Sequence, residues 1–510
     1  MLGPYRIAAL RHYSTNIAQV ITNGNKLTGK PTINYLIRAV NDKLISDNDT
    51  LPRINGFIQS IKNLKNVTFV DLYDGTCSEP LKLLIPRTRL KSLGVDLKMG
   101  QTLDLTNWKV KLTPERIQTF ELVMDPVSEL KLLGDIHTQM DDDTVRETSG
   151  MTSSAVVTEY PLQMKQRLTL PFLRQHPLVK HKTNYLASVM RFRSHVMTKL
   201  INILTVENGF VMCNPPLLTK NDTEGNNETF KTVPKKLNLT VSTQLHLEIL
   251  AQNMKNVFTI TPCFRAEMSD TGRHLAEFWM LELESVNIVT LDELIHTIKT
   301  LLISLGEALL RDPTTPLPND TLLPNDTCNS KDIRDRWVRV SNPQNWHTIT
   351  YTDAVNIINE NTSDALPPIT WGEPLASVHE KYISETHFMD GFVSITQYPR
   401  EIKPFYMKWS DDSGKTVDCL DLIFPHSVGE LAGGSLREDR IDKLNDAIQS
   451  NGGDNTVGEL QWYVDLRRMG SFPRGGFGIG IERLLCYFFA CKNVKDTIPF
   501  YRVMKEDVML

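Results

Sequence analysis

The chain has 510 residues, of which 41% are hydrophobic and 23% charged, and its net charge is −4. This length predicts two to four domains with ample core, and any nucleic-acid contact must use local basic patches rather than overall charge. No apolar run approaches the roughly 18 residues that a membrane-spanning helix needs, so no membrane partner is expected. The seven cysteines form no CxxC pair, which argues against a zinc site or disulfide framework and indicates a reducing compartment.

The start of the chain is basic and free of acidic residues. The first acid is Asp42, and the basic residues before it are interspersed with Ser and Thr. This composition is typical of a mitochondrial transit peptide. It predicts a targeting segment over 1–30 and a location in the mitochondrial matrix, with a simply basic or disordered start as the alternative.

Residues 53–123 alternate in short apolar and polar runs, separated by turn signals such as Asp74-Gly75. Five short strands in about 70 residues predict a small β-barrel, and the five-stranded OB-fold is the candidate. We therefore predict an OB-fold domain over 45–135. The polar stretch "MDDDTVRETSGMTSS" predicts a linker or hinge over 136–180.

The remainder, 181–510, mixes helical and strand patterns and predicts a larger α+β domain. A helix follows residue 184 and stops at Asn208-Gly209. A second amphipathic helix begins with the spacing Thr290 to Glu293, which resembles a capping box.

The stretch "FRAEMSDTGRHLAEFWMLELE", 264–284, holds many fixed charges beside the aromatic pair Phe278-Trp279. A β-hairpin with a polar loop fits its alternation. Arg265 and Glu267 would share one strand face, Arg273 and His274 would lie in the loop, and Phe278 would return on the second strand. An arginine can bind phosphate, a carboxylate can accept from the adenine amine, and an aromatic ring can stack on a purine. The hairpin thus predicts an ATP site without a P-loop, or alternatively a surface salt-bridge network.

A second glycine-rich motif lies near the end of the chain. In "GGFGIGIERLLCY", Gly478 and Gly480 precede Glu482 and Arg483. A glycine-rich strand that enters a helix brings the backbone close to a ligand, with Arg483 in the first helical turn.

Together these motifs resemble the class II aminoacyl-tRNA synthetases of subclass b. The hairpin looks like motif 2, "GIGIERL" like motif 3, and "GFVMCNPPLL" like the end of motif 1, with Pro215 at its proline. The blocks "NDTEGNNETF", "YPREIKPFYMKW" and "DLIFPHSVGELAGGSLREDR" are similar to the asparaginyl enzymes. The resemblance implies an N-terminal OB-fold barrel followed by an antiparallel-sheet catalytic domain flanked by helices. It also implies a homodimer that associates through the motif 1 region.

The resemblance implies the roles of the ATP-binding residues. Arg265 would hold the α-phosphate and the substrate carboxylate, while Arg483 would meet the γ-phosphate and act with Arg265 in catalysis. The remaining assignments are Glu267 to the adenine amine, Phe278 to the adenine ring, and Arg273 or His274 to the β- and γ-phosphates. Asp421 and Glu430 look like the ligands of Mg²⁺, an ion that prefers oxygen ligands and phosphates; Asp418 is the alternative to Asp421.

The resemblance likewise implies an amino-acid site. Glu224 and Gln244 match positions near the α-ammonium group, and Arg437 matches the arginine that reads the side-chain carbonyl. A carboxylate would accept from the amide of Asn and repel Asp, and Glu282 is the candidate. Glu277 competes for this role, and a structural hairpin carboxylate is the other interpretation of Glu282.

The implied reaction activates L-asparagine with ATP and transfers it to tRNA(Asn). An aspartyl or non-discriminating enzyme is the alternative, and the predicted barrel argues against asparagine synthetase, which shares only the catalytic core. In the barrel, Phe69 matches the aromatic residue that stacks on the anticodon, with Lys82 beside it where a glutamine is usual. Phe69 could equally be a residue of the barrel core.

Overall fold

The computed structural model describes most of the chain: residues 31–116, 118–136, 160–162, 168–220, 229–232, 237–411 and 413–505. The predicted targeting segment and most of the predicted linker lie outside these residues. The chain divides into two compact units, and the boundary between Ser188 and Val189 falls inside a helix.

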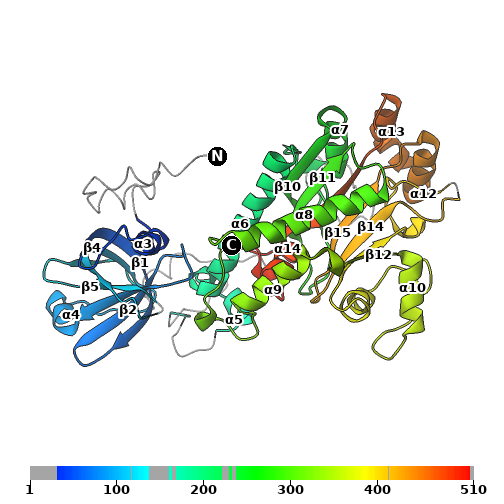
Figure 1. The fold of residues 1–510 in the computed structure, drawn as a ribbon. Helices are drawn as coiled ribbons and strands as arrows, with labels where there is room; N and C mark the ends of the chain where they lie inside the picture. Colours follow the sequence, from blue (N-terminus) through cyan, green and yellow to red (C-terminus); the bar gives the residue numbers. More distant parts are fainter. Residues whose placement is uncertain are drawn as a thin grey trace, which may run out of the picture. The chain divides into compact units, whose positions relative to one another are not determined.

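The first unit contains a sheet of six strands (Figure 1). The strands are β1 Thr50–Asn63, β2 Val67–Tyr73, β3 Leu81–Pro86, β4 Thr102–Leu112, β5 Phe120–Val123 and β6 Glu129–Gly134. The order β1-β2-β3-β5-β4 is closed by a further pairing between β1 and β4, and β6 adds to β4 outside this ring. The predicted barrel of five strands is therefore confirmed, with the pairing expected of an OB-fold.

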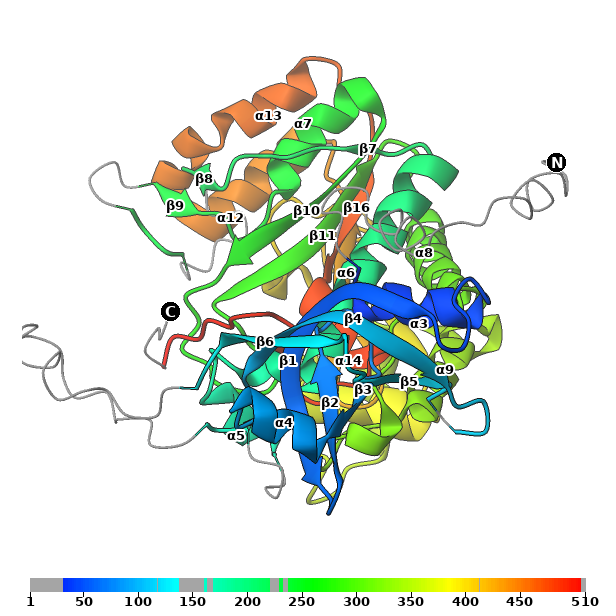
Figure 2. The same cartoon turned by 90° about the vertical axis from the view of Figure 1, so that its left-hand side faces the viewer.

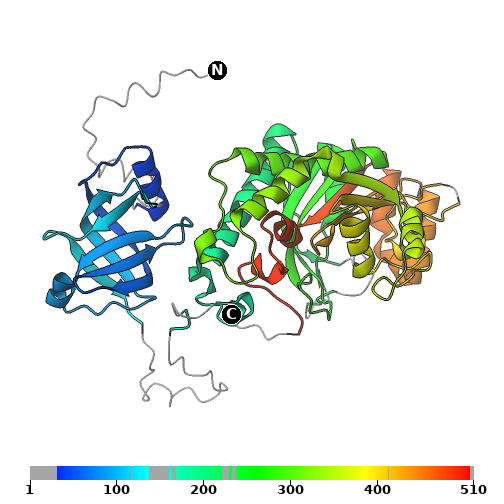
Figure 3. The same cartoon turned by 60° about the horizontal axis from the view of Figure 1, so that its bottom comes forward.

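Alternating side chains fill the barrel. On β2, Thr68, Val70 and Leu72 are buried while Phe69 and Asp71 between them are partly exposed, as the period of two along a strand requires. The helix α3, Ile33–Asn41, packs its apolar face on the same core and covers one end of the barrel (Figure 3). Its start is fixed by Thr32, whose side chain accepts from the main-chain nitrogen of Tyr35.

The second unit is built on an eight-stranded, largely antiparallel sheet of order β12-β13-β14-β15-β16-β11-β10-β7. Its strands are β7 Val211–Met212, β10 Asn256–Phe264, β11 Glu277–Ser285, β12 Trp346–Thr350, β13 Phe392–Thr396, β14 Cys419–Phe424, β15 Gly429–Leu436 and β16 Gly475–Gly480. The strands β10 and β11 pair from Phe264 opposite Glu277 onward, so the predicted hairpin is confirmed.

Helices flank this sheet. The long helix α8, Leu291–Arg311, lies against β14, β15 and β16 with α9, Ser330–Ser341, beside it (Figure 1). The helix α7, Gln244–Met254, packs on β10 and β11, and α13, Gln461–Arg468, lies next to it (Figure 2). The predicted capping box at the start of α8 is present, with Thr290 and Glu293 bonded reciprocally.

The helix α6, Asn184–Asn202, continues into a π-turn over Ile203–Glu207 and ends before Gly209, whose φ is +67°. A positive φ favours glycine, so the predicted Asn208-Gly209 stop is confirmed. No helix in the described part of the chain is long and apolar enough to cross a membrane.

Candidate active site

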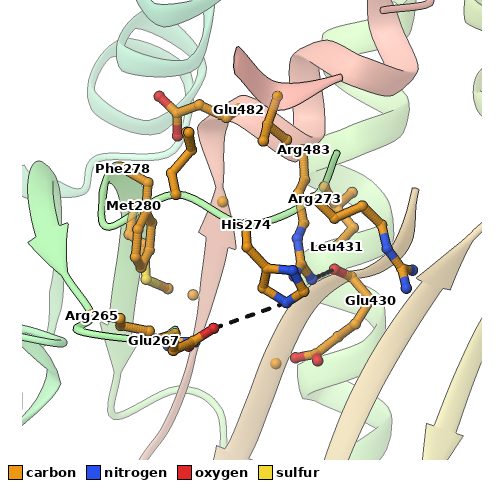
Figure 4. A pocket seen from close by; sticks show the side chains of 15 residues that line it. Arg265, Glu267, Arg273, His274, Phe278, Met280, Glu430, Leu431, Glu482 and Arg483 are labelled. Atoms are coloured by element: carbon orange, nitrogen blue, oxygen red, sulfur yellow. Dashed lines mark hydrogen bonds and ion pairs between the residues drawn. The ribbon is translucent and has the colours of Figure 1, made fainter. Parts of the chain in front are cut away.

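A cleft opens over the middle of the eight-stranded sheet, where the β10–β11 hairpin, β15 and β16 come together. It consists of two adjoining pockets. The first is lined mainly by the hairpin loop and the start of α14, Ile481–Phe488 (Figure 4). The second is lined by α7, β11, β14, β15, β16 and the segment 402–407. The pockets share five residues: Arg265, Met280, Glu430, Gly433 and Gly478. A ligand with two chemically different halves could therefore lie across both.

Arg265 stands at the junction of the two pockets. It follows the end of β10, rather than lying within the strand, and its main-chain nitrogen donates to the carbonyl of Ala276 at 3.0 Å. Its guanidinium lies 5.3 Å from the centre of the Phe278 ring, a cation–π arrangement. One guanidinium nitrogen is 3.8 Å from a carboxylate oxygen of Glu267. The hairpin thus gathers a cation, a carboxylate and an aromatic face, as predicted for an ATP site.

His274 faces Glu267 across the hairpin loop, with 3.9 Å between Nε2 and the carboxylate (Figure 4). Its Nδ1 lies 2.6 Å from the hydroxyl of Thr271. Burial lowers the pKa of His274 below the ordinary 6.5, and nearby Arg483 lowers it further. The unliganded site therefore favours the neutral ring, while the Glu267 carboxylate opposes this effect.

The other two arginines of the first pocket are held from different sides. Arg273 donates to Ser377 and to Glu380, at 3.5 Å for the latter. Arg483, in the first turn of α14, donates to the main-chain carbonyl of Glu430. The sequence motifs drew attention to both arginines, but not to Ser377 and Glu380, which lie on a different helix.

The start of α14 is anchored by a buried carboxylate. Glu482 accepts from Arg193 at 2.6 Å and from the main-chain nitrogen of Trp279 at 2.9 Å. Burial raises the pKa of Glu482, and Arg193 opposes that effect. This contact ties α6, α14 and β11 together and so fixes the direction in which Arg483 points. Arg193 carries no motif signal in the sequence.

In the second pocket, Arg437 is held rigidly. Its Nε donates to Glu284 at 3.1 Å and its Nη2 to the other oxygen of Glu284 at 2.8 Å, while Nη1 donates to Ser435 at 2.6 Å. Arg437 and Glu284 are almost completely buried, with side-chain exposures of 3% and 1%. Such a bidentate pair gives fixed geometry. Arg437 lines the second pocket, as does Glu284, a neighbour that the sequence did not indicate; that Arg437 reads the substrate side chain stays a prediction.

Glu282 also lines the second pocket, but its oxygens already have partners. They accept from the hydroxyl of Ser242 and from Thr243, whose main-chain nitrogen lies 2.8 Å away. These residues lead directly into Gln244, the first residue of α7, which also lines the pocket. Glu282 thus holds the start of α7 and places a negative charge beside the pocket.

The structure puts Glu277 at the outer end of β11 and not among the lining residues of either pocket. Glu224 lies outside the described residues.

Two carboxylates border the space between the pockets. A Cβ atom placed on Gly433 would lie 3.3 Å from an oxygen of Glu430 and 3.8 Å from an oxygen of Asp421. Lys403 donates to Asp421 at 2.6 Å. Mg²⁺ is commonly held by one or two carboxylates together with substrate phosphates. The pair stays a predicted Mg²⁺ site, in which both Asp421 oxygens accept from Lys403, at 2.7 and 2.6 Å. Asp418, the alternative, lines neither pocket.

Behind Arg437 lies a buried network of charges. Glu248, on α7, accepts from Arg474 at 2.6 Å, from Arg467 at 3.2 Å and from the hydroxyl of Tyr463 at 2.7 Å. Burial alone raises the pKa of Glu248, but the arginines lower it to about 2. The network connects α7, α13 and the residue before β16, and it reaches the second pocket because Glu248 lies 3.8 Å from Nε of Arg437.

The barrel carries the predicted pair Phe69 and Lys82 on its outer surface. Phe69 is half-buried and is not part of the barrel core. Lys82 is exposed on β3 and lies opposite Asp71 in the register of β2 and β3. Asp71 shares a face of β2 with Phe69. The interpretation of Phe69 as a core residue is therefore wrong, and both side chains can meet a ligand from outside.

Known proteins are similar to this chain over nearly its whole length. The family description "tRNA synthetases class II (D, K and N)" matches residues 171–504. The mitochondrial asparagine–tRNA ligase of Saccharomyces cerevisiae is 40% identical over 482 residues, 89% of this chain and 92% of that protein. The corresponding Schizosaccharomyces pombe ligase is 36% identical over 89% of this chain and 94% of that protein. The chain belongs to the class II aminoacyl-tRNA synthetases of the D, K and N group.

The fold agrees with this assignment. The crystal structure of asparaginyl-tRNA synthetase from Pyrococcus horikoshii complexed with asparaginyl-adenylate matches with a TM-score of 0.74 and 24% identity, over 90% of this chain and 96% of that one. The class II fold predicted from the sequence motifs is thereby confirmed.

Proposed function

We propose that this chain is an asparagine–tRNA ligase, which joins L-asparagine to tRNA(Asn) at the expense of ATP. The observation that carries the proposal is the pair of adjoining pockets with Arg265 between them. One pocket has the aromatic ring, carboxylate and arginines that ATP requires, and the other has the rigid Arg437 and a carboxylate beside it. The curated relatives at 40% and 36% identity are both named asparagine–tRNA ligases.

The first step is activation of the amino acid. A carboxylate oxygen of asparagine attacks the α-phosphorus of ATP, the bond from that phosphorus to the bridging oxygen breaks, and pyrophosphate leaves. Arg265 lies where both substrates meet and stabilises the charge that develops on the α-phosphate. Arg483 holds the outer phosphates from the opposite side. Mg²⁺ would be held by Asp421 and Glu430 and would neutralise phosphate charge.

The second step transfers the acyl group to the tRNA. A terminal ribose hydroxyl of tRNA attacks the acyl carbon of the adenylate, loses its proton and displaces AMP. No protein nucleophile is needed, since positioning accounts for much of the rate. Within this scheme Gln244 and Glu224 bind near the α-ammonium group of asparagine. Glu267 and Phe278 bind adenine.

The test is ATP–pyrophosphate exchange on the purified chain, with Asn or Asp as the amino acid, followed by charging of tRNA(Asn). Exchange with Asn and charging of that tRNA are the expected results. Equal exchange with Asp would favour a non-discriminating enzyme, and exchange with Asp alone an aspartyl enzyme. Release of a free amide product in a reaction that needs no tRNA would contradict the proposal.

Glu282 supplies the negative charge that disfavours aspartate. Replacing it by glutamine keeps the shape and removes the charge, so the preference for Asn over Asp in kcat/KM should fall by at least about tenfold. The measurement is exchange with each amino acid on the wild-type and Glu282→Gln proteins. Glu277→Gln is the matched control, because that side chain lies on the same strand outside the pockets. An unchanged preference with a lower melting temperature would assign Glu282 a purely structural role.

The barrel, 45–135, is proposed as the anticodon-binding domain and 181–510 as the catalytic domain. Phe69 would stack on an anticodon base, and such stacking is worth about 1–3 kcal/mol. The Phe69→Ala variant should therefore raise the KM for tRNA(Asn) about tenfold or more, with Lys82→Ala having a smaller effect. Asn-dependent exchange, which needs no tRNA contact, should not change. Leu64→Ala, at a residue 46% exposed between β1 and β2, is the control.

A homodimer through the motif 1 region is also part of the proposal. Three apolar side chains are exposed where α6 ends and the edge strand β7 begins: Val206 is 77% exposed, Val211 43% and Met212 38%. Burying such a strand edge against a second copy would cover both its apolar side chains and its unpaired backbone groups.

The relatives named mitochondrial and the basic start of the chain support a mitochondrial location, which we place in the matrix.

A further inference from the structure

The short helix α11, Ser377–Lys381, lies outside the three family motifs and contacts Arg273, a residue that lines the first pocket. Two of its side chains meet the hairpin loop. Ser377 accepts a hydrogen bond from Nη2 of Arg273, and the Glu380 carboxylate lies 3.5 Å from Nη1 of the same guanidinium. The two contacts take different nitrogens of one arginine, so they fix the plane of the guanidinium as well as its position.

The backbone next to this pair is shaped to receive it. Gly429, the first residue of β15, has φ +71°, and a Cβ added there would lie 2.6 Å from the Glu380 carboxylate and would also collide with the Arg273 guanidinium. A side chain at this position would therefore be strained by the backbone conformation and would displace the ion pair. The pair lies directly against the start of the strand that carries Glu430.

The surroundings of Glu380 make the pairing with Arg273 important. The side chain is only 16% exposed, and burial, followed by the proximity of Glu430, raises its pKa to about 7, while Arg273 and Arg483 oppose this. Without the Arg273 guanidinium, a largely buried carboxylate would face a second carboxylate. Arg273 in turn has a side-chain exposure of 26% and would lose a fixed conformation without α11.

We propose that Glu380 is a positioning residue that, together with Ser377, fixes Arg273 in the orientation that binds the outer phosphates of ATP. This inference rests on the proposed ATP site. An arginine has five N–H donors, and Arg273 lines the first pocket, so the donors that Glu380 and Ser377 do not use are available to a ligand bound there. Because α11 holds the guanidinium before ATP arrives, the entropy cost of ordering a long side chain on a loop is not added to the cost of binding.

The experiment is a double-mutant cycle with Arg273→Ala, Glu380→Ala and the combined variant. The readouts are the dissociation constant for ATP by calorimetry without amino acid, and the KM for ATP and for Asn in pyrophosphate exchange. Each single substitution should weaken ATP binding about tenfold, while the KM for Asn changes less than about twofold. The double variant should be no weaker than Arg273→Ala alone, because Glu380 acts only through Arg273.

Two further variants separate positioning from folding. Glu380→Gln keeps the size and one oxygen acceptor, so it should restore part of the ATP affinity that Glu380→Ala loses. Lys381→Ala, at a side chain 59% exposed on the same helix, is the matched control and should bind ATP normally. Additive losses in the double variant, or unchanged ATP binding by Glu380→Ala, would overturn the inference. Wild-type protein that binds ATP but shows no exchange with Asn would contradict the proposed function. The dissociation constants for ATP in the double-mutant cycle would still test the role of Glu380.

Discussion

Replacing Arg265 by alanine should abolish Asn-dependent ATP–pyrophosphate exchange, with a loss of about 10³-fold or more in kcat. The guanidinium lies at the junction of the two pockets, so it can meet the attacking carboxylate and the α-phosphate together. Preorganised positive charge at this point stabilises the transition state more than either bound substrate. The measurement is pyrophosphate exchange at saturating Asn and ATP, with a thermal melt of each protein.

Arg311→Ala is the control for this substitution, because that side chain is 75% exposed at the end of α8 and pairs with Glu307 on the same helix. It should leave the exchange rate unchanged. Loss of the Arg265 side chain is not expected to unfold the protein, since it is 30% exposed and its main-chain hydrogen bond to the hairpin remains. Exchange at near wild-type rate in Arg265→Ala would refute the assignment of this arginine.

Replacing Glu248 by alanine should lower the free energy of unfolding by about 3–5 kcal/mol, the cost of leaving buried charges without their partner. The Glu248 carboxylate is 0% exposed and lies between Arg467 and Arg474, which are each 1% exposed. Its removal leaves these two guanidinium groups and the Tyr463 hydroxyl without their common acceptor. The measurement is urea unfolding at pH 7.

Glu307→Ala is the matched control for the Glu248 substitution. Its side chain is 41% exposed and forms an i,i+4 pair with Arg311 on the surface of α8, so the change in unfolding free energy should be at most about 0.5 kcal/mol. Comparable stability of both variants would show that the buried network contributes little.

The network also predicts the pH dependence of the Glu248 effect. The folded pKa of Glu248 is lowered from 4.5 to about 2, so the stabilisation from its ionised form is fully present above pH 4.5 and lost as the pH falls through about 2. The stability difference between the wild-type protein and Glu248→Gln should therefore be constant between about pH 6 and 8. A difference that shrinks within that range would mean that the carboxyl group titrates near neutrality.

Local patterns in the sequence predicted those parts of the fold that short-range rules determine. The capping box at Thr290 and Glu293, the stop at Gly209 and the hairpin between β10 and β11 each depend on residues that are near neighbours in the chain. Arg265 and Glu267 were placed at the right end of the hairpin, though they follow the strand instead of lying in it.

The contacts that complete the site were not predictable in this way. Arg273 and Glu380 are 107 positions apart, and Arg193 and Glu482 are 289 apart. In the sequence, Glu248 resembles any charged residue on a solvated helix face, and only the packing of α13 against α7 buries it. Periodicity reports whether a side chain faces a core, but it carries no information about which distant charge will pair with it.

The position of Arg265 has a thermodynamic consequence. Because one guanidinium borders both pockets, the substrate that arrives first changes the electrostatic surroundings that the other one meets. The affinities for asparagine and ATP are then linked, and the linkage is reciprocal: the factor by which ATP alters the dissociation constant of asparagine equals the factor by which asparagine alters that of ATP.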